Sequence, residues 1–215
     1  MEVMQHEREL LIEYGNQIYQ SKMTRGTGGN LSIYNDETGV MAITPSGIPY
    51  SMIRPEDIVL MKLDGTIIDG KRKPSSEYPM HAHVYRERPE FKAMIHMHST
   101  YATVLSTLRK PLVAIDYLVA HGGGKDVRVA DYASFGTWQL AENALKAMDG
   151  RCAVLLSNHG LNVVGKTLDE VFAKAEIIEF CCELYVRALA CGEPVVLSDQ
   201  EMAFIVEEFN HYGQK

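Results

Sequence analysis

The chain has 215 residues, of which 46% are hydrophobic and 23% charged, a composition typical of a globular protein large enough to bury a full core. Its formal net charge is −7 at pH 7 and it has no basic cluster, so we expect no nucleic-acid partner. No apolar run approaches the roughly 18 residues of a membrane span, and the charged N-terminus does not resemble a signal peptide, so we expect no membrane association. The four cysteines lack C-x-x-C spacing and are typical of reduced thiols, which predicts a cytoplasmic protein.

The N-terminal half is predicted to contain one helix and several strands. Apolar positions at helical spacing predict a helix over 3–22. A glycine-rich turn at 26–30 leads into a strand, and a second strand ends in the turn at 44–47. A short helical turn follows, and then two strands joined at Asp64-Gly65, which is a hairpin signal.

The C-terminal half alternates helices with apolar segments. The sequence predicts first a helix from about Ser75, then a strand carrying His96 and His98, and then a helix over 100–109. A strand or strand–helix passage over 111–124 follows, and after it a helix capped near Thr137. The last predicted elements are a strand with His159 at its end, a long helix stopped by Gly192, and a helical tail from Ser198.

This order of elements predicts the fold class. Helices and strands are interleaved without a linker or an internal repeat, so we expect one α/β domain over residues 1–215. The hairpin and the close spacing of the strands favour a mixed, mostly antiparallel sheet over a doubly wound parallel sheet.

Three histidines lie on two apolar segments that we interpret as buried strands: His96, His98 and His159. Residues i and i+2 of a strand project from the same face, so His96 and His98 should point together, and His159 should join them from another strand end. Three imidazoles are the ligand set of a catalytic zinc site, which keeps its fourth position for water or substrate. Each histidine alone is typical of a satisfied core residue, whereas the trio favours a metal site that could also accept other divalent ions.

A second H-x-H pair, His81 and His83, serves as a comparison. It falls in a helix that should begin near Ser75, with Pro79 in the first turn. Two residues apart on a helix correspond to about 200° around the axis, so these side chains diverge and form no chelate. We expect both to be partly exposed helix residues, although one of them could approach the site.

Three polar turns are candidate phosphate-binding segments: 26–30, 44–47 and 74–77. Each presents small residues, hydroxyls or an amide, and accessible backbone N–H groups. The last lies at a predicted helix N-terminus, where the helix dipole favours a phosphate dianion. Ordinary turn and capping chemistry explains each turn on its own, and the first lacks the Gly-Lys-Ser/Thr ending of a Walker loop.

Six motifs together resemble the class II aldolase/adducin-head family in order and spacing: GTGGNLS, TPSG, KPSSE, IHMHS, YASFGT and SNHG. Within this family the chain is most similar to the bacterial L-fuculose-1-phosphate aldolases, and the resemblance extends over nearly the whole chain. It implies a single three-layer α/β/α domain with a central mixed sheet. It also implies homotetramers of fourfold symmetry with active sites between subunits.

The resemblance further implies roles for individual residues. His96, His98 and His159 match the ligands of one zinc ion per subunit. Glu77 matches a carboxylate that ligates the zinc in the empty enzyme and then acts as general acid/base. Tyr117 matches a tyrosine that reaches into the neighbouring subunit's site as proton donor.

Other matched positions are expected to bind the substrate's two ends. Phe135 and Tyr212 match residues that shape the aldehyde end. Ser46 stands where the fuculose-phosphate aldolases carry Thr, and either hydroxyl can hydrogen-bond an anion. The positions expected at the phosphate are Gly29, Asn30, Ser46, Gly47, Ser75 and Ser76, with Thr27 beside them.

The implied activity is the reversible cleavage of a 2-ketose 1-phosphate to dihydroxyacetone phosphate and a small aldehyde. L-Fuculose 1-phosphate would give lactaldehyde, and a 5-deoxypentulose 1-phosphate would give acetaldehyde. Zinc would stabilise the enediolate as a Lewis acid, while Glu77 would handle the proton on the metal side and Tyr117 would serve the aldehyde oxygen. No lysine stands in a clearly buried run, so we do not expect a Schiff-base mechanism.

Other members of the superfamily remain alternatives. Methylthioribulose-1-phosphate dehydratases share the zinc ligands and the phosphate turns. Pentulose-5-phosphate 4-epimerases also resemble this chain, but they carry Asp where it has Glu77. Adducin-like interaction heads lack the zinc histidines, all of which are present here, so a purely structural role is not favoured.

Overall fold

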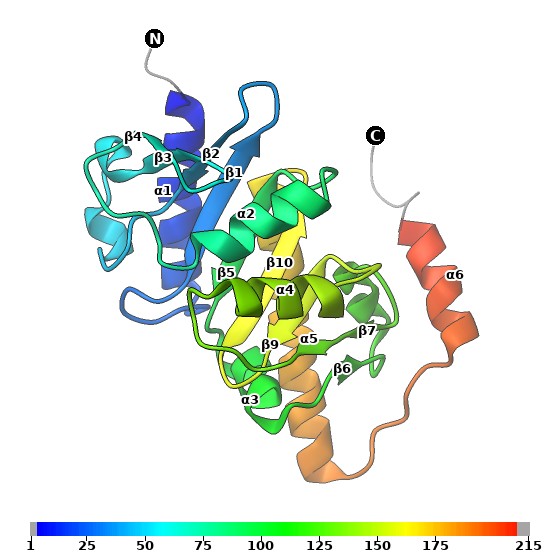
Figure 1. The fold of residues 1–215 in the computed structure, drawn as a ribbon. Helices are drawn as coiled ribbons and strands as arrows, with labels where there is room; N and C mark the ends of the chain where they lie inside the picture. Colours follow the sequence, from blue (N-terminus) through cyan, green and yellow to red (C-terminus); the bar gives the residue numbers. More distant parts are fainter. Residues whose placement is uncertain (1–3, 210–215) are drawn as a thin grey trace.

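The computed structural model describes residues 4–209, in which a central sheet carries the fold (Figure 1). Within these residues the eight-stranded sheet has the order β4-β3-β2-β1-β5-β10-β9-β8. Neighbouring strands are antiparallel except for the parallel pair β8 and β9, which confirms the predicted mixed, mostly antiparallel sheet. The strands are β1 (Asn30–Asn35), β2 (Val40–Ile43), β3 (Val59–Lys62), β4 (Ile67–Asp69), β5 (Ala93–Met97), β6 (Leu112–Val113), β7 (Asp126–Val127), β8 (Val129–Ala130), β9 (Ala153–Leu156) and β10 (Gly160–Gly165).

Helices cover both faces of this sheet, which gives the three layers that the resemblance implied. Helices α2 and α4 lie on one face, and α1, α3 and α5 on the other (Figure 1). None of the helices within residues 4–209 is long and apolar enough to cross a membrane. The helices are α1 (Gln5–Gln20), α2 (Tyr78–Glu87), α3 (Thr100–Leu108), α4 (Trp138–Ala147), α5 (Leu168–Cys191) and α6 (Asp199–Phe209), with short 3-10 helices η1 (Tyr50–Met52), η2 (Pro55–Asp57) and η3 (Tyr117–Gly122).

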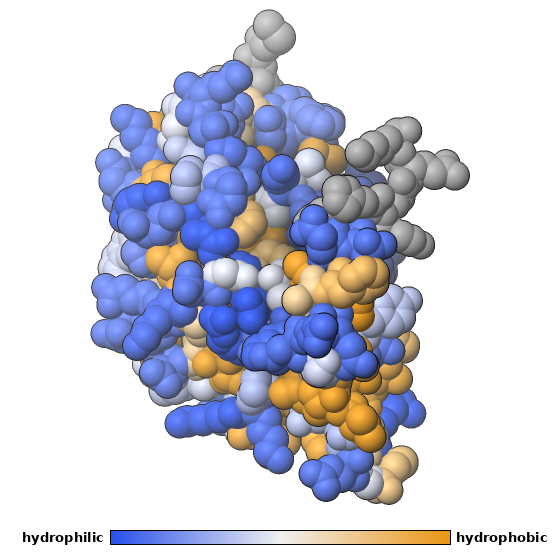
Figure 2. Space-filling view, turned by 90° about the vertical axis from the view of Figure 1, so that its right-hand side faces the viewer, coloured by the Kyte–Doolittle hydropathy of each residue, from blue (hydrophilic) through white to orange (hydrophobic). Residues whose placement is uncertain are grey.

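The C-terminal helix α6 packs beside η3, on the outside of these layers. Met202 is its buried contact with the core, whereas Phe204 on the same helix and Val195 before it are exposed. Figure 2 looks onto the side of the molecule that carries α6 and shows apolar side chains gathered over the lower part of this face. The described part of the chain therefore leaves apolar surface uncovered on this side.

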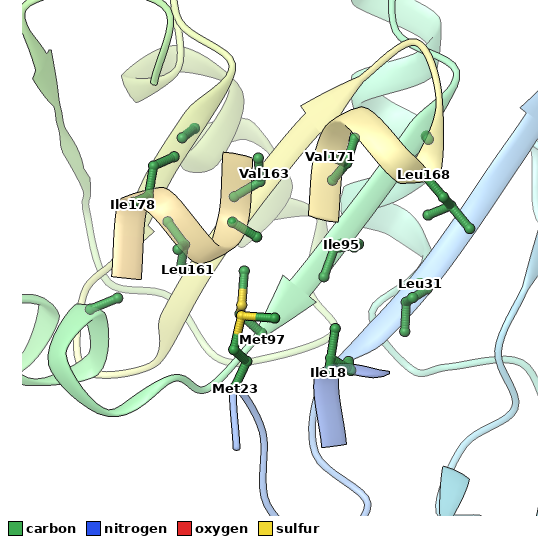
Figure 3. Close-up of a cluster of buried hydrophobic side chains, with 14 of the residues drawn as sticks. Ile18, Met23, Leu31, Ile95, Met97, Leu161, Val163, Leu168, Val171 and Ile178 are labelled. Atoms are coloured by element: carbon green, nitrogen blue, oxygen red, sulfur yellow. The ribbon is translucent and has the colours of Figure 1, made fainter. Parts of the chain in front are cut away.

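The alternation of side chains along the strands divides the core into two clusters. On β5, Ile95 and Met97 face the layer of α1, α3 and α5, whereas Met94 faces α2 and α4. Figure 3 shows the first cluster, in which residues of β1, β5 and β10 meet residues of α1 and α5. Its labelled members are Ile18, Met23, Leu31, Ile95, Met97, Leu161, Val163, Leu168, Val171 and Ile178.

Three predicted elements differ in detail from the structure. Residues 153–165 form a hairpin of β9 and β10, so His159 lies in its turn and not at the end of one strand. Helix α2 begins at Tyr78, because the preceding residues form a tight turn in which Tyr78 N–H bonds to the Ser75 carbonyl. The passage over 111–124 contains β6 and then η3, and β6 pairs with β7 in a small second sheet that was not predicted.

Helix α3 begins directly after the histidine pair, and Glu179 of α5 anchors its N-terminus. The Glu179 carboxylate accepts hydrogen bonds from the Ser99 hydroxyl (2.6 Å) and from the backbone N–H groups of Tyr101 (2.8 Å) and Ala102 (2.9 Å). These N–H groups have no partner inside the helix, and a negative charge is favourable at a helix N-terminus. The contact therefore fixes the direction of the chain just beyond His98.

Replacing Glu179 by Ala should lower the free energy of unfolding by about 2 kcal/mol, because three donors lose a charged acceptor. The matched control is Glu183→Ala, one turn further along α5, where the carboxylate pairs with the exposed Arg187. This control should cost at most about 0.5 kcal/mol. Urea denaturation measures both values, and equal losses in the two variants would contradict the anchoring role.

Candidate active site

The three predicted histidines converge at one end of the sheet. His96 is on β5, His98 follows that strand directly, and His159 lies in the β9–β10 turn. The Nε2 atoms of His96 and His98 are 2.9 Å apart, and the ring centroids of His96 and His159 are 4.7 Å apart. Each residue offers one ring nitrogen within 4.8 Å of the others, which makes the trio a candidate metal site.

Glu77 joins these histidines from the turn before α2. Its Oε2 lies 3.2 Å from His96 Nε2 and accepts a hydrogen bond from Asn30 Nδ2 (2.9 Å), and its Oε1 lies 3.5 Å from His159 Nε2. Although Glu77 occupies the N-cap position of α2, its side chain makes no capping bond. Oε1 is buried and has no hydrogen-bond partner among the described residues. The carboxylate therefore faces the histidines and does not serve the helix.

The register of three adjacent strands surrounds His96 with amides. His96 of β5 lies opposite Asn30 of β1 on one side and opposite Asn162 of β10 on the other. Asn162 Nδ2 points at Met80 Sδ (2.8 Å), so its Oδ1 accepts the proton of His96 Nδ1 (2.7 Å). The other ring nitrogen, Nε2, is thus left with a lone pair facing His98 and Glu77.

The electrostatics of the cluster keep its imidazoles neutral. Burial, together with the neighbouring His98, lowers the pKa of His96 to about 3. Burial and the neighbouring His96 lower the pKa of His159 to about 4, and burial also lowers the pKa of His98. Neutral imidazole nitrogens meet here a carboxylate oxygen, Glu77 Oε1, that has no hydrogen-bond partner among the described residues. This donor set fits a divalent cation.

A cavity of about 440 Å³ opens beside the histidines. Its wall includes all seven residues that were predicted at the phosphate: Thr27, Gly29, Asn30, Ser46, Gly47, Ser75 and Ser76. The turns at 44–47 and 74–77 are held together by backbone bonds from Ser46 N–H to the Lys73 carbonyl (3.0 Å) and from Ser75 N–H to the Thr44 carbonyl (3.0 Å). The fold thus places the three polar turns around one cavity.

Two glycines allow the first of these turns to approach the histidines. A Cβ atom on Gly28 would lie 2.8 Å from His98 Nδ1, and one on Gly29 would lie 2.7 Å from the His96 carbonyl oxygen. Gly29 also has φ +75°, which L side chains rarely adopt. A larger residue at either position would push the turn away from the candidate metal site.

The predicted aldehyde-end residues are placed differently from one another. Phe135 lines the cavity and is 70% exposed. Tyr117, at the start of η3, is also exposed but does not line this cavity, and its ring centroid lies 6.3 Å from that of Phe209. Tyr212 lies outside the described residues.

The predicted partial exposure was wrong for His81, which instead is the member of the second H-x-H pair that approaches the site. This side chain is fully buried, with Nε2 2.5 Å from Asn30 Oδ1 and Nδ1 2.6 Å from Ser32 Oγ. The reason is that His81 is on the face of α2 that packs on the sheet. His83 diverges from it as predicted and meets the ring of Trp138 edge-on.

Sequence reasoning also missed residues of the cavity wall and of its support. Tyr132, the first residue of the YASFGT motif, lines the cavity, and so does Asn158, which lies in the β9–β10 turn with φ 54°. Asn162 gave no signal of its own, because its role depends on strand register.

Residues 9–186 match the family model described as the class II aldolase and adducin N-terminal domain. The chain belongs to this family. The 5-deoxy-D-ribulose 1-phosphate aldolase of Bacillus thuringiensis serovar kurstaki is 45% identical over 213 residues, covering 99% of this chain and 100% of that protein. The 5-methylthioribulose-1-phosphate/5-deoxyribulose-1-phosphate aldolase of Rhodospirillum rubrum is 40% identical, covering 96% of this chain and 92% of that protein.

A solved structure agrees with these relatives. An L-fuculose 1-phosphate aldolase superposes on this chain with a TM-score of 0.93 and 48% sequence identity, covering 95% of this chain and 96% of that one. The predicted family and fold class are thus confirmed. The chain is an enzyme of the class II aldolase type, and therefore a lyase.

The metal-free protein should lose stability as the pH falls below about 6.5. Burial holds the pKa of His81 at about 3, whereas an unfolded chain protonates its histidines near pH 6.5. Between these values the unfolded state binds more protons, so the full stability is present above pH 6.5 and falls by up to about 1.4 kcal/mol per pH unit for each such histidine below it. Urea denaturation between pH 7.5 and 5 measures this slope. His81→Gln should make the slope shallower, and an unchanged slope would contradict the buried neutral state of His81.

Proposed function

We propose that the protein is a zinc-dependent aldolase that reversibly cleaves 5-deoxyribulose 1-phosphate to dihydroxyacetone phosphate and acetaldehyde. The observation that carries this proposal is the convergence of neutral imidazoles and Glu77 at one end of a cavity walled by small polar turns. The similarity to the Bacillus thuringiensis enzyme along its whole length favours a 5-deoxypentulose substrate. L-Fuculose 1-phosphate, giving lactaldehyde, is the second candidate, because a fuculose-phosphate aldolase shares the fold so closely.

The polar turns bind and orient the substrate's phosphate in this proposal. The hydroxyls of Ser46, Ser75 and Ser76 and the backbone N–H groups of Gly29 and Gly47 are available as donors along the cavity wall. Holding the phosphate here places the C3–C4 bond beside the histidines and Glu77. The binding energy of the non-reacting phosphate thereby contributes to positioning at the reacting carbons.

Glu77 is proposed to exchange the proton at C3. Its Oε2 accepts a hydrogen bond from Asn30, whereas its buried Oε1 faces His159 and makes no protein hydrogen bond among the described residues. The residue itself lines the cavity. His96, His98 and His159 would hold a zinc ion, which would supply Lewis-acid stabilisation of the negative charge that develops during the reaction. In the direction of condensation, the Glu77 carboxylate would take the C3 proton of dihydroxyacetone phosphate onto Oε1. In the direction of cleavage, the C4 hydroxyl proton would leave to Tyr117, the electron pair of the broken C3–C4 bond would stay on C3, and the proton held on Glu77 Oε1 would return to C3, which yields dihydroxyacetone phosphate and the aldehyde.

The aldehyde end is proposed to be completed by a neighbouring subunit. Phe135 lines the cavity, and the exposed Tyr117 would reach the site of the adjacent subunit to exchange the proton of the C4 oxygen. Tyr212 is proposed, from the family resemblance alone, to help shape the aldehyde end. The uncovered apolar surface around α6 supports assembly into a homotetramer (Figure 2). Each subunit would contribute residues 1–215 as one domain.

The proposal also places the enzyme in the cytoplasm. Cys152, Cys181, Cys182 and Cys191 are all free thiols, and the first three are buried. A reducing compartment is consistent with this pattern. No nucleic-acid or membrane partner is proposed.

The decisive assay is the release of dihydroxyacetone phosphate from 5-deoxyribulose 1-phosphate and, in parallel, from L-fuculose 1-phosphate. Release should stop on chelation and return on addition of zinc. Glu77→Gln should lower kcat by at least about 100-fold with little change in Tm, because proton transfer is lost. Glu87→Gln, an exposed change at the end of the same helix, is the control and should behave as wild type.

Each arm of this assay can contradict a different part of the proposal. No release from the zinc-loaded protein with either substrate would favour the dehydratase or epimerase chemistry of the superfamily. Release that survives complete removal of metal would contradict the zinc dependence. A wild-type rate in Glu77→Gln would remove Glu77 from the mechanism.

A further inference from the structure

Helix α2 and strand β1 present matching rows of polar side chains to each other. Glu77, His81 and Tyr85 are spaced by four residues and face the sheet, while Asn30 and Ser32 are spaced by two on β1. Four residues of helix rise about 6 Å and two residues of strand about 6.6–6.8 Å, so the two repeats stay aligned over this length. The rows form one continuous chain of hydrogen bonds that ends at Glu77.

The residues that form this series of hydrogen bonds are shielded from water. His81 and Ser32 are fully buried, Tyr85 is 1% exposed and Asn30 is 4% exposed. Polar groups buried to this degree are costly unless each finds a partner. The hydrogen bonds between them therefore decide how each group is oriented.

The direction of every hydrogen bond follows from the carboxylate. Glu77 Oε2 can only accept, so Asn30 must turn its Nδ2 to Glu77 and its Oδ1 to His81. His81 Nε2 must then carry the proton, and His81 Nδ1 accepts from the Ser32 hydroxyl at 2.6 Å. Because the Ser32 proton is used at His81, Ser32 Oγ accepts from the Tyr85 hydroxyl at 2.6 Å, and that hydroxyl also donates to the Ser32 carbonyl oxygen (3.1 Å).

We propose that His81 is a positioning residue for the reaction: by donating from Nε2 to Asn30 Oδ1, it fixes the amide of Asn30 and, through it, the carboxylate of Glu77. This inference rests on the proposed function, in which Glu77 exchanges a proton with the substrate. Rotating the Asn30 amide by 180° would set Oδ1 against Glu77 Oε2 and Nδ2 against the His81 N–H. The His81 N–H thus disfavours the rotated amide and keeps Glu77 Oε2 bonded to Asn30, with Oε1 facing His159.

The kinetic test uses variants that separate positioning from packing. His81→Leu keeps an apolar side chain in the space but removes the donor, and should lower kcat/KM by about 10–100-fold, as expected for the loss of a residue that orients a site group. His81→Gln retains an N–H donor and should recover most of this loss. His83→Leu, two residues away and pointing elsewhere, should stay within about twofold of wild type.

A double-variant cycle identifies the route of the effect. If His81 acts through Asn30, then His81→Leu should lower kcat/KM by less than about twofold in an Asn30→Ala background. A loss in that background as large as in the wild type would overturn the proposal. So would a His81→Gln variant that is as impaired as His81→Leu.

A second measurement does not depend on turnover. Neutron diffraction from the deuterated protein locates the exchanged protons on His81 and the orientation of the Asn30 amide. We expect His81 protonated on Nε2 and not on Nδ1, with Asn30 Nδ2 directed at Glu77; the opposite tautomer or a flipped amide would overturn the inference. Failure of the wild type to cleave either sugar phosphate would contradict the proposed function instead, and the neutron result would still decide the arrangement.

Discussion

The site is organised by a buried, neutral histidine whose two ring nitrogens are committed in opposite directions. His96 gives its Nδ1 proton to Asn162, which leaves the Nε2 lone pair facing His98 and Glu77. Desolvation keeps the pKa of His96 at about 3, so the imidazole stays neutral at neutral pH and its Nε2 can act as a metal ligand. A cation is the group that can satisfy such a set, and the roles proposed for the surrounding residues depend on it.

The sheet register makes this arrangement possible. Asn30, His96 and Asn162 lie side by side on three adjacent strands, so two amides flank one imidazole without any loop having to be placed. Ligands and supports carried by strands are held more rigidly than those carried by loops. The phosphate is proposed to bind to the polar turns of the cavity wall, which are more adaptable than the strands.

Much of this could be predicted from the sequence, because it follows from local periodicity. The i, i+2 argument placed His96 and His98 together, since β5 runs in extended form to the residue before His98. The spacing of polar turns, read with the family resemblance, indicated the residues that line the cavity. The hairpin at Asp64-Gly65 could also be predicted from neighbouring residues alone, and Gly65 adopts φ +94° there.

What could not be predicted depends on tertiary packing. The helix argument showed that His81 and His83 diverge, but the side that packs on the sheet is decided by how α2 lies on β1. The pairing of Asn162 with His96 likewise requires the register of β10 on β5. The two-residue strands β6 and β7 have too little sequence to give a pattern, and their pairing comes from partners distant along the chain.

The metal site is tested most directly by zinc-edge X-ray absorption on the zinc-loaded protein, with the metal content determined on the same sample. One zinc ion per subunit with the scattering pattern of three imidazoles is the expected result, because His96, His98 and His159 are the convergent nitrogens. Sub-stoichiometric zinc, or a bound zinc whose ligands include no imidazole cluster, would contradict the metal site on which the proposed chemistry depends.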